Sequence, residues 1–300
     1  MFRLRVSDLK YDVDDTLEVR TFEFLKTIGF LGLDNDSITI RKRTEIGINI
    51  FSKCFLSKPK KGWTTTEIAD ELGVSIHSVY SSVKWLRELN FLTEDFPGRV
   101  EEPKRIRVWH YDVKKAWKGV ETQAKICIEN YRECIMNISK VIVKEGAGVG
   151  NMPARMEMVE KDEKFDFTLR EMKVFSDPYN DLEEMLFSIG LVKQRRDAKE
   201  ENKSLRILYD CFLMRTDRVW TAEEVAKWVE VTKPTAYRII NRLLALGFIG
   251  RCRARDGGSP SSAFYLQGGD VETSWSNVEK KINLCLLQYK KMIDGLVDSL

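Results

Sequence analysis

Histidines and long apolar runs are scarce in this chain of 300 residues, and each scarcity excludes a class of protein. The only histidines are His77 and His110, so a zinc site built from histidine ligands is not expected. The six cysteines form no Cys-x-x-Cys pair and lie in apolar contexts, which indicates buried, reduced thiols. No apolar run approaches the roughly 18 residues of a membrane span, and no signal peptide precedes the polar N-terminus, so we expect a cytoplasmic protein.

Sequence motifs of catalysis are also missing. There is no Walker A loop, no nucleophile elbow and no paired-histidine metal motif. The glycines of residues 146–150 resemble part of a dinucleotide-binding fingerprint. However, the residues before them continue a helical pattern and no β-α-β unit follows, which favours a flexible joint. We therefore expect neither an enzyme nor a bound cofactor or metal.

The stretch from Trp220 to Phe264 has the pattern of two short helices followed by a basic hairpin. A first helix begins after the capping residue Thr221, and Glu230-Val231 forms a tight turn. The second helix is expected to run from residue 232 to a terminating glycine at 247. Arginines alternate in the strand that follows, before an Asp-Gly-Gly turn. This order of elements is that of a winged helix-turn-helix, whose second helix normally enters the major groove of DNA.

The same stretch occurs earlier in the chain, displaced by 157 residues, so that Trp63-Thr64 matches Trp220-Thr221. After one residue inserted in the hairpin of the second copy, the offset becomes 158, and Trp117 returns as Trp275. A long fixed offset with many identities indicates a tandem duplication. Further matches are Glu67 with Glu224, Ala69 with Ala226, Tyr80 with Tyr237, Leu86 with Leu243, Leu89 with Leu246 and Tyr131 with Tyr289.

A long helix is expected after each hairpin. Apolar residues there recur at alternating spacings of four and three, which is the heptad pattern of a coiled coil. Such helices are expected to pair, either between two chains in a homodimer or within one chain as an intramolecular pseudo-dimer. The residues predicted to form this seam are Trp117, Val120, Ala124, Cys127, Tyr131, Trp275, Val278, Ile282, Cys285 and Tyr289.

The fold predicted is a mainly helical α+β protein with two tandem-duplicated winged helix-turn-helix domains, each followed by a long coiled-coil-type helix. The first unit spans 1–144, with an N-terminal extension, a winged helix at 44–111 and a heptad helix at 112–144. A linker covers 145–163. The second unit spans 164–300, with a similar extension, a winged helix at 203–267 and a heptad helix at 271–300.

From Thr64 to Leu92 the sequence has the form Thr-x-x-Glu-Ile-Ala, then Gly-Val-Ser, Val-Tyr and Leu-x-x-Leu-x-Phe-Leu. This pattern resembles the TrmB-like and MarR-like regulators of the winged helix-turn-helix superfamily. The tandem arrangement also resembles plasmid replication initiators with two winged domains. The resemblance implies that the second helix of each motif reads DNA and that the terminal helix pairs subunits.

The partner predicted is double-stranded DNA, because a helix with outward polar and cationic side chains fits the major groove. The aromatic pair Tyr80 and Tyr237 is predicted to pack in the core. The residues predicted to contact DNA in the second unit are Lys233, Thr235, Arg238, Asn241, Arg242, Arg251, Arg253 and Arg255. Those in the first unit are His77, Ser78, Ser81, Ser82, Lys84, Arg99, Lys104, Arg105 and Arg107.

These features predict a sequence-specific DNA-binding protein, most simply a nucleoid-associated transcriptional regulator. A replication initiator or a chromatin-organising protein is the alternative within nucleic-acid biology. A protein-interaction scaffold is the alternative from another class, because winged domains also serve as adaptors. The net charge of +3 is modest, so a DNA-binding surface must arise from local clustering of cations.

Overall fold

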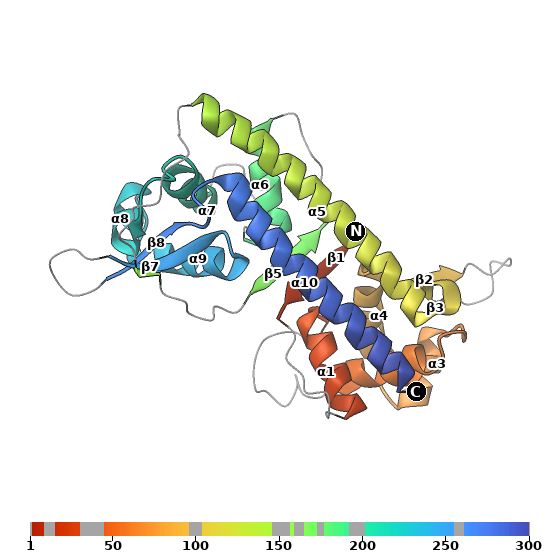
Figure 1. Cartoon of the computed structure of the whole chain (residues 1–300). Coiled ribbons are helices and arrows are strands. Elements are labelled where there is room, and N and C mark those ends of the chain that lie inside the picture. The colour runs from red at the N-terminus through yellow and green to blue at the C-terminus, as the bar shows by residue number, and fades with distance from the viewer. Residues whose placement is uncertain are drawn as a thin grey trace. The chain divides into compact units, whose positions relative to one another are not determined.

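The computed structural model describes residues 2–8, 16–30, 45–95, 104–145, 157–158, 165–172, 177–191, 202–254 and 261–299 (Figure 1). The prediction of a mainly helical α+β protein with small antiparallel sheets is confirmed. The chain forms two compact units. Unit 1 comprises Met1–Ile126 with Leu284–Leu300, and unit 2 comprises Cys127–Asn283.

Unit 1 begins with strand β1 and helix α1 and then forms two helices and a hairpin. Strands β2 and β3 pair antiparallel, with Leu92 opposite Val108. Its elements are β1 (Arg3–Ser7), α1 (Leu17–Thr27), the π-helix η1 (Ile50–Leu56), α3 (Thr65–Leu72), α4 (Ile76–Glu88), β2 (Leu92–Asp95), β3 (Arg105–Val108), the 3-10 turn η2 (Trp109–Tyr111) and the first part of α5 (Val113–Lys144). The last part of α10 (Val271–Asp298) also belongs to unit 1.

Unit 2 follows a similar order of elements, with β4, α7 and β6 in addition. Its sheet has four strands in the order β4-β7-β8-β6. The elements are β4 (Glu157–Met158), β5 (Asp166–Arg170), α6 (Pro178–Ser188), α7 (Lys203–Arg206), the π-helix η3 (Ile207–Leu213), β6 (Trp220–Thr221), α8 (Ala222–Trp228), α9 (Lys233–Leu246), β7 (Ile249–Ala254) and β8 (Ser261–Leu266).

The first helix of each predicted helix-turn-helix begins with the same capping arrangement. The hydroxyl of Thr64 accepts from the backbone N–H of Glu67, whose carboxylate accepts in return from the backbone N–H of Thr64. Thr221 and Glu224 repeat both bonds in unit 2. Such a capping box satisfies N–H groups that a helix start leaves without partners, so the predicted helix starts are confirmed.

The turn between the two helices requires a left-handed backbone in both units. Gly73 supplies it in unit 1 with a φ of 62°, whereas Glu230 takes a φ of 58° at the equivalent place in unit 2. The second helix of unit 2 ends at Gly247, also left-handed with a φ of 81°. The predicted turn at Glu230 and the predicted helix end at Gly247 are thus confirmed.

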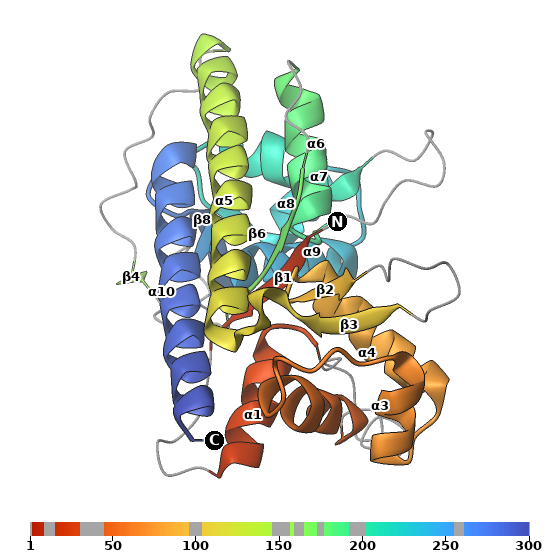
Figure 2. The same ribbon diagram turned by 90° about the vertical axis from the view of Figure 1, so that its right-hand side faces the viewer.

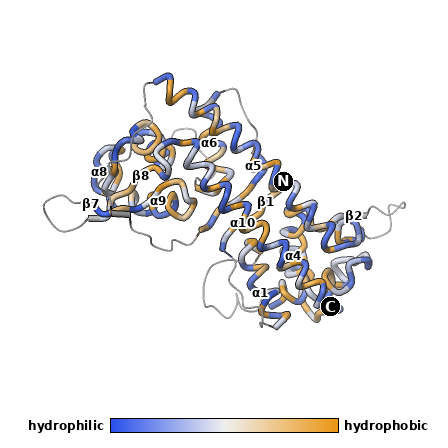
Figure 3. Tube along the Cα trace, in the orientation of Figure 1, coloured by the Kyte–Doolittle hydropathy of each residue, from blue (hydrophilic) through white to orange (hydrophobic). Residues whose placement is uncertain are grey.

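The two long helices, α5 and α10, pack on each other within the chain. In unit 1 the start of α5 lies against the end of α10, where the ammonium group of Lys114 is 2.8 Å from a carboxylate oxygen of Asp298. In unit 2 the end of α5 lies against the start of α10, where Arg132 pairs with Glu279. Within each unit the two helices run side by side (Figures 1 and 2). Hydrophobic and hydrophilic residues alternate along each of them (Figure 3), as expected for helices with one buried face.

Every predicted seam residue is buried within this single chain. Trp117 packs edge-on against Tyr289 in unit 1, with ring centroids 6.1 Å apart. Tyr131 packs in the same way against Trp275 in unit 2, at 5.9 Å. The contact is therefore made twice, with the roles of the two helices exchanged. The predicted seam residues are all at most 3% exposed.

The tyrosines of these pairs also hold a β-strand. The hydroxyl of Tyr289 donates to the carbonyl of Ser7 at 2.7 Å and accepts from the N–H of the same residue at 2.8 Å. Tyr131 makes the same two bonds with Arg170, at 2.8 and 2.9 Å. Burial raises the pKa of both phenols, so the hydroxyls remain protonated donors over the physiological range.

The boundaries differ from the predicted ones in two respects. The domains were expected to contain one whole long helix each, but each helix contributes to both units because the seam is formed between them. Part of the predicted linker, Glu157–Met158, is strand β4, paired antiparallel with β7. The hairpin of unit 2 therefore gains a strand that its sequence pattern did not indicate. The glycines of residues 146–150 lie outside the described residues.

We expect Tyr131→Phe and Tyr289→Phe each to lower the free energy of unfolding by about 1–3 kcal/mol, because each leaves a buried backbone N–H and C=O without the hydroxyl. Chemical denaturation would measure the loss. The matched control is Tyr237→Phe, because the Tyr237 side chain is 39% exposed. Losses no larger than that of the control would contradict this role of the hydroxyls.

Stability should also decline at alkaline pH. All six cysteines are buried and unpaired by disulfides, and burial raises the pKa of Cys54 to about 11 and those of Cys127 and Cys211 to about 12. Unfolded thiols ionise near pH 8.5, so the folded state binds more protons above that pH and loses stability as pH rises. Denaturation at about pH 8 and about pH 10 would measure the decline. Cys54→Ala with Cys211→Ala should flatten it, and equal slopes would contradict the prediction.

Candidate nucleic-acid interface

Helix α9 separates a buried face from an exposed polar face. Its buried face includes Ala236, Ile239, Ile240 and Leu243, which fixes the orientation of the helix. Thr232 is the N-cap residue of the helix. Pro234 lies in the first turn, where a backbone N–H has no acceptor within the helix. Of the predicted DNA-contacting residues of α9, Lys233, Arg238, Asn241 and Arg242 are exposed and Thr235 is half-buried.

Two of these side chains are best placed to meet a ligand. Arg238 and Asn241 are exposed on α9, and the described part of the chain provides no hydrogen bond or ion pair for either side-chain polar group. One turn of helix separates them, so both project from the same side. Arg can pair bidentately with guanine and Asn with adenine, which makes this pair suitable for reading base edges.

The other predicted residues of α9 have partners in unit 2. The guanidinium of Arg242 donates to the carbonyls of Gly190 and Leu191, at 2.6 and 3.2 Å, and so binds the segment that follows α6. Lys233 is 3.6 Å from the carboxylate of Glu223. A hydrogen bond from Lys227, with the charges of both lysines, holds the pKa of that carboxyl below its usual range, so it offsets part of the cationic face.

The hairpin of unit 2 supplies further cations beside α9. Arg253 is exposed on β7, and Arg251 is half-buried, with its guanidinium 5.6 Å from the centre of the Phe264 ring. Because these two residues alternate along one strand, they share a face of the sheet. Arg255 lies outside the described residues.

Helix α4, the counterpart of α9 in unit 1, carries a less cationic face. His77, Ser81 and Lys84 are exposed, whereas Ser78 and Ser82 are half-buried. The hydroxyls of Ser81 and Ser82 donate to carbonyls one turn earlier in the same helix, and the Ser78 hydroxyl bonds to that of Ser75. The serine hydroxyls are therefore already engaged, and Lys84 is the only cation predicted for this face.

The cations of the unit 1 hairpin are partly used in packing. Arg105 donates to the carbonyl of Gly62 at 2.9 Å and is 3.5 Å from the carboxylate of Glu67. The guanidinium of Arg107 lies 4.9 Å from the centre of the Tyr111 ring. Lys104 is exposed. Arg99 lies outside the described residues.

The prediction that Tyr80 and Tyr237 pack in the core is wrong. Tyr80 is 57% exposed on α4 and Tyr237 is 39% exposed on α9. Each follows a buried residue, Val79 and Ala236, and a step of one residue turns the side chain about 100° away from the buried face. The helical phase could have revealed this exposure. The duplication thus places one exposed tyrosine on each candidate surface.

We expect Arg242→Ala to destabilise the protein by about 1 kcal/mol, because the carbonyls of Gly190 and Leu191 lose a charged donor. Arg238→Ala should leave stability within about 0.5 kcal/mol of wild type, since this side chain has no partner among the described residues. Thermal denaturation of both variants checks the difference. Equal melting temperatures would mean that the Arg242 bonds contribute nothing.

Comparison of the chain with protein-family models, curated proteins and solved structures found no match. Among the described residues, no helix is both long and apolar enough to cross a membrane. No group of three or more His, Cys, Asp and Glu side chains in that part of the chain could hold a metal ion. A function must therefore be inferred from the exposed faces of α4 and α9 and their hairpins.

Proposed function

We propose that this protein binds double-stranded DNA sequence-specifically and regulates transcription, through two winged helix-turn-helix modules carried by one chain. The observation that carries the proposal is the exposed face of α9 with Arg238 and Asn241, in a unit whose hairpin adds Arg251 and Arg253. Bidentate contacts of this kind discriminate between bases by about 1–3 kcal/mol each. The hairpin cations suit the flanking phosphates or minor groove.

We infer that α5 and α10 act as a coiled-coil-type pair that holds the two modules in one molecule. The burial of their seam residues within the chain supports this inference. A second chain is then not needed to cover the seam, and the protein can act as an intramolecular pseudo-dimer. Sedimentation at two protein concentrations would test it, and a mass that doubles with concentration would favour the homodimer.

Unit 2 is proposed to set most of the sequence specificity. The face of α9 carries an arginine and an asparagine for which the described residues provide no partner, whereas the hydroxyls of Ser81 and Ser82 bond within α4. Serine also reads bases weakly or contacts only phosphate. Unit 1 would then position the complex or read a degenerate half-site.

A second candidate function for unit 1 is protein binding. Helix α4 exposes Ile76 and Tyr80, at 43% and 57%, on a face with few cations. Exposed aromatic and aliphatic side chains of this kind are typical of protein interfaces. Unchanged DNA affinity in Tyr80→Ala would agree with this role, whereas a loss of DNA affinity would assign the surface to DNA.

Binding to DNA should weaken steeply with salt. Cations that contact phosphates release counterions, so log K should fall with log salt at about −0.9 per phosphate contacted. With several contacts in each module we expect a slope of about −4 to −8, measured by fluorescence anisotropy with a random duplex. A DNA affinity that does not change with salt, or no binding to any duplex at about 50 mM salt, would contradict the proposal.

Arg238→Ala should lower specific affinity by about 1–3 kcal/mol and relax the preference at one base pair. Ser81→Ala should change affinity by less than about 0.5 kcal/mol. Lys290→Ala is the charge control, because Lys290 is exposed on α10, away from both hairpins in sequence. A library of duplex variants, selected first from random DNA, would measure all three. If Ser81→Ala lowered specific DNA affinity more than Arg238→Ala did, unit 1 would set the sequence specificity.

A further inference from the structure

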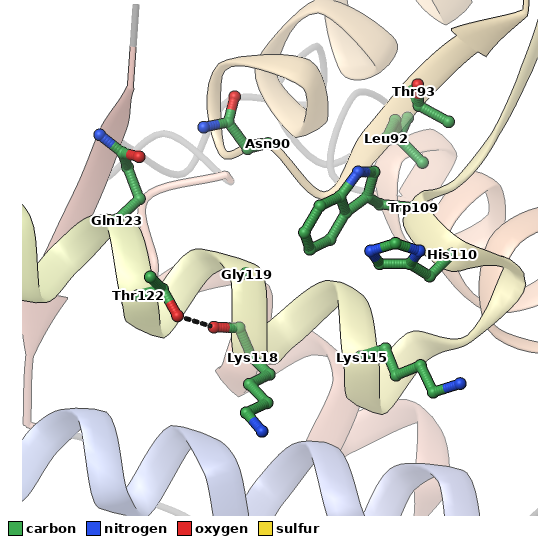
Figure 4. A pocket seen from close by; sticks show the side chains of 10 residues that line it. All are labelled: Asn90, Leu92, Thr93, Trp109, His110, Lys115, Lys118, Gly119, Thr122 and Gln123. Atoms are coloured by element: carbon green, nitrogen blue, oxygen red, sulfur yellow. Dashed lines mark hydrogen bonds between the residues drawn. The ribbon is translucent and has the colours of Figure 1, made fainter.

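Unit 1 contains a cavity that the proposed DNA contacts do not use (Figure 4). It has a volume of about 810 Å³ and lies between strand β2, the turn after β3 and one face of α5. Trp109 and His110 project from the turn, Gly119 lies on α5 beneath the indole, and Asn90 lies at the opposite side (Figure 4).

The turn that carries these aromatic residues has a direct counterpart in unit 2. The N–H of Trp109 donates to the carbonyl of Phe91 at 3.0 Å, and the N–H of Gln267 donates to that of Phe248 at the same distance. Trp109-His110-Tyr111 therefore occupies the place of Gln267-Gly268-Gly269. The backbone frame is shared, while the side chains differ completely.

The turn requires a left-handed backbone, which glycine adopts without strain. Gly268 and Gly269 have φ values of 91° and 81°, and His110 and Tyr111 have 55° and 57° at the same positions. Asn90, on the far side of the cavity, has a φ of 58° where unit 2 has Gly247. The left-handed region of φ and ψ is unfavourable for residues other than glycine, and such strained residues cluster at ligand sites. Unit 1 thus retains strained residues around the cavity at places where its own repeat uses glycine.

Gly119 completes the arrangement. A Cβ atom at this position would lie 2.5 Å from Cζ3 and 2.8 Å from Cε3 of Trp109, so the indole can rest on α5 only because residue 119 has no side chain. Unit 2 has Asn277 at the equivalent position. The indole is 38% exposed and its centroid is 4.0 Å from that of the His110 ring. The two rings are tilted by 49° to each other and both line the cavity, and we call this pair the aromatic platform.

The charge around the platform favours an anion. Lys115 and Lys118 line the cavity from α5, and none of its described lining residues is acidic. Both lysines are exposed and point away from the indole in Figure 4, but their four-carbon stems allow them to turn toward a bound anion. Neutral donors and acceptors are supplied by Asn90, Thr93 and Gln123.

We propose that this cavity binds a nucleotide, with the base stacked on Trp109 and the phosphates held by Lys115 and Lys118. A nucleotide matches the lining of the cavity in three respects. Its planar base suits the aromatic platform, its polar base edges suit the neutral side chains, and its charged phosphates suit the lysines. This site is distinct from the faces of α4 and α9, so it adds an effector to the DNA-binding function.

Calorimetric titration of the whole protein with ATP, adenosine and pyrophosphate tests the proposal. ATP should bind with a Kd below about 1 mM, and adenosine and pyrophosphate should each bind more weakly because each keeps one half of the contacts. Trp109→Ala should weaken ATP binding by about 5-fold to 150-fold, the range for loss of one base stack. Lys115→Gln with Lys118→Gln should weaken ATP binding while leaving adenosine binding unchanged.

The matched control is Lys290→Gln with Lys291→Gln, which removes the same charge from exposed positions of α10. It should bind ATP as wild type does. No ATP binding by the wild type, or equal affinities in the Trp109, lysine and control variants, would overturn the proposal. Duplex DNA binding by the wild type is measured separately, so failure at this cavity leaves the DNA-binding proposal intact.

The variant His110→Gly tests whether the turn at Trp109–Tyr111 serves ligand binding or only packing. Removing the strained side chain should leave the melting temperature equal to that of wild type or raise it by about 2 °C, yet weaken ATP binding several-fold. This result would also show that the variants fold. A lowered melting temperature with unchanged ATP affinity would mean that the aromatic platform serves only packing.

Discussion

Two buried phenol hydroxyls connect the helical seam to the strands of the N-terminal extensions. Each hydroxyl satisfies both the N–H and the C=O of one strand residue, so the strand end cannot shift without leaving two backbone groups unpaired. Each tyrosine ring also packs against a tryptophan of the other long helix. The core of each unit therefore depends on a side chain that fixes a helix–helix contact and a strand position together.

Around this shared frame the two copies have diverged at both buried and exposed positions. The capping boxes, the left-handed turn and the tyrosine–tryptophan pairs are kept in both units, whereas buried positions such as Ala124 and Ile282 differ. The differences that bear on function lie on the exposed face of the second helix, in the hairpin and in the turn after it. Duplication makes each copy a reference for the other, so a strained residue such as His110 can be recognised because the other copy shows the unstrained solution.

Local chemistry made much of the fold predictable from the sequence. Capping residues, turn glycines and the heptad spacing act over a few residues, and the helices they predicted are present. The pairing of β4 with β7 depends on residues about 95 positions apart, and Glu157–Met158 is too short to show a strand pattern. For the candidate site, helical phase located Arg238 and Asn241. It could not show that Arg242 binds the carbonyls of Gly190 and Leu191, because that contact is made with a segment distant in the sequence.

The division of each long helix between the two units has a consequence for synthesis on the ribosome. Unit 1 consists of Met1–Ile126 together with Leu284–Leu300, so its core lacks Tyr289 until the whole of unit 2 has been synthesised. Ser7 and Trp117 are synthesised long before this partner. Unit 1 therefore cannot complete its core before unit 2 is made, whereas N-terminal domains commonly fold first during synthesis. A chain that stops before α10 would leave both units without the tyrosine–tryptophan contact.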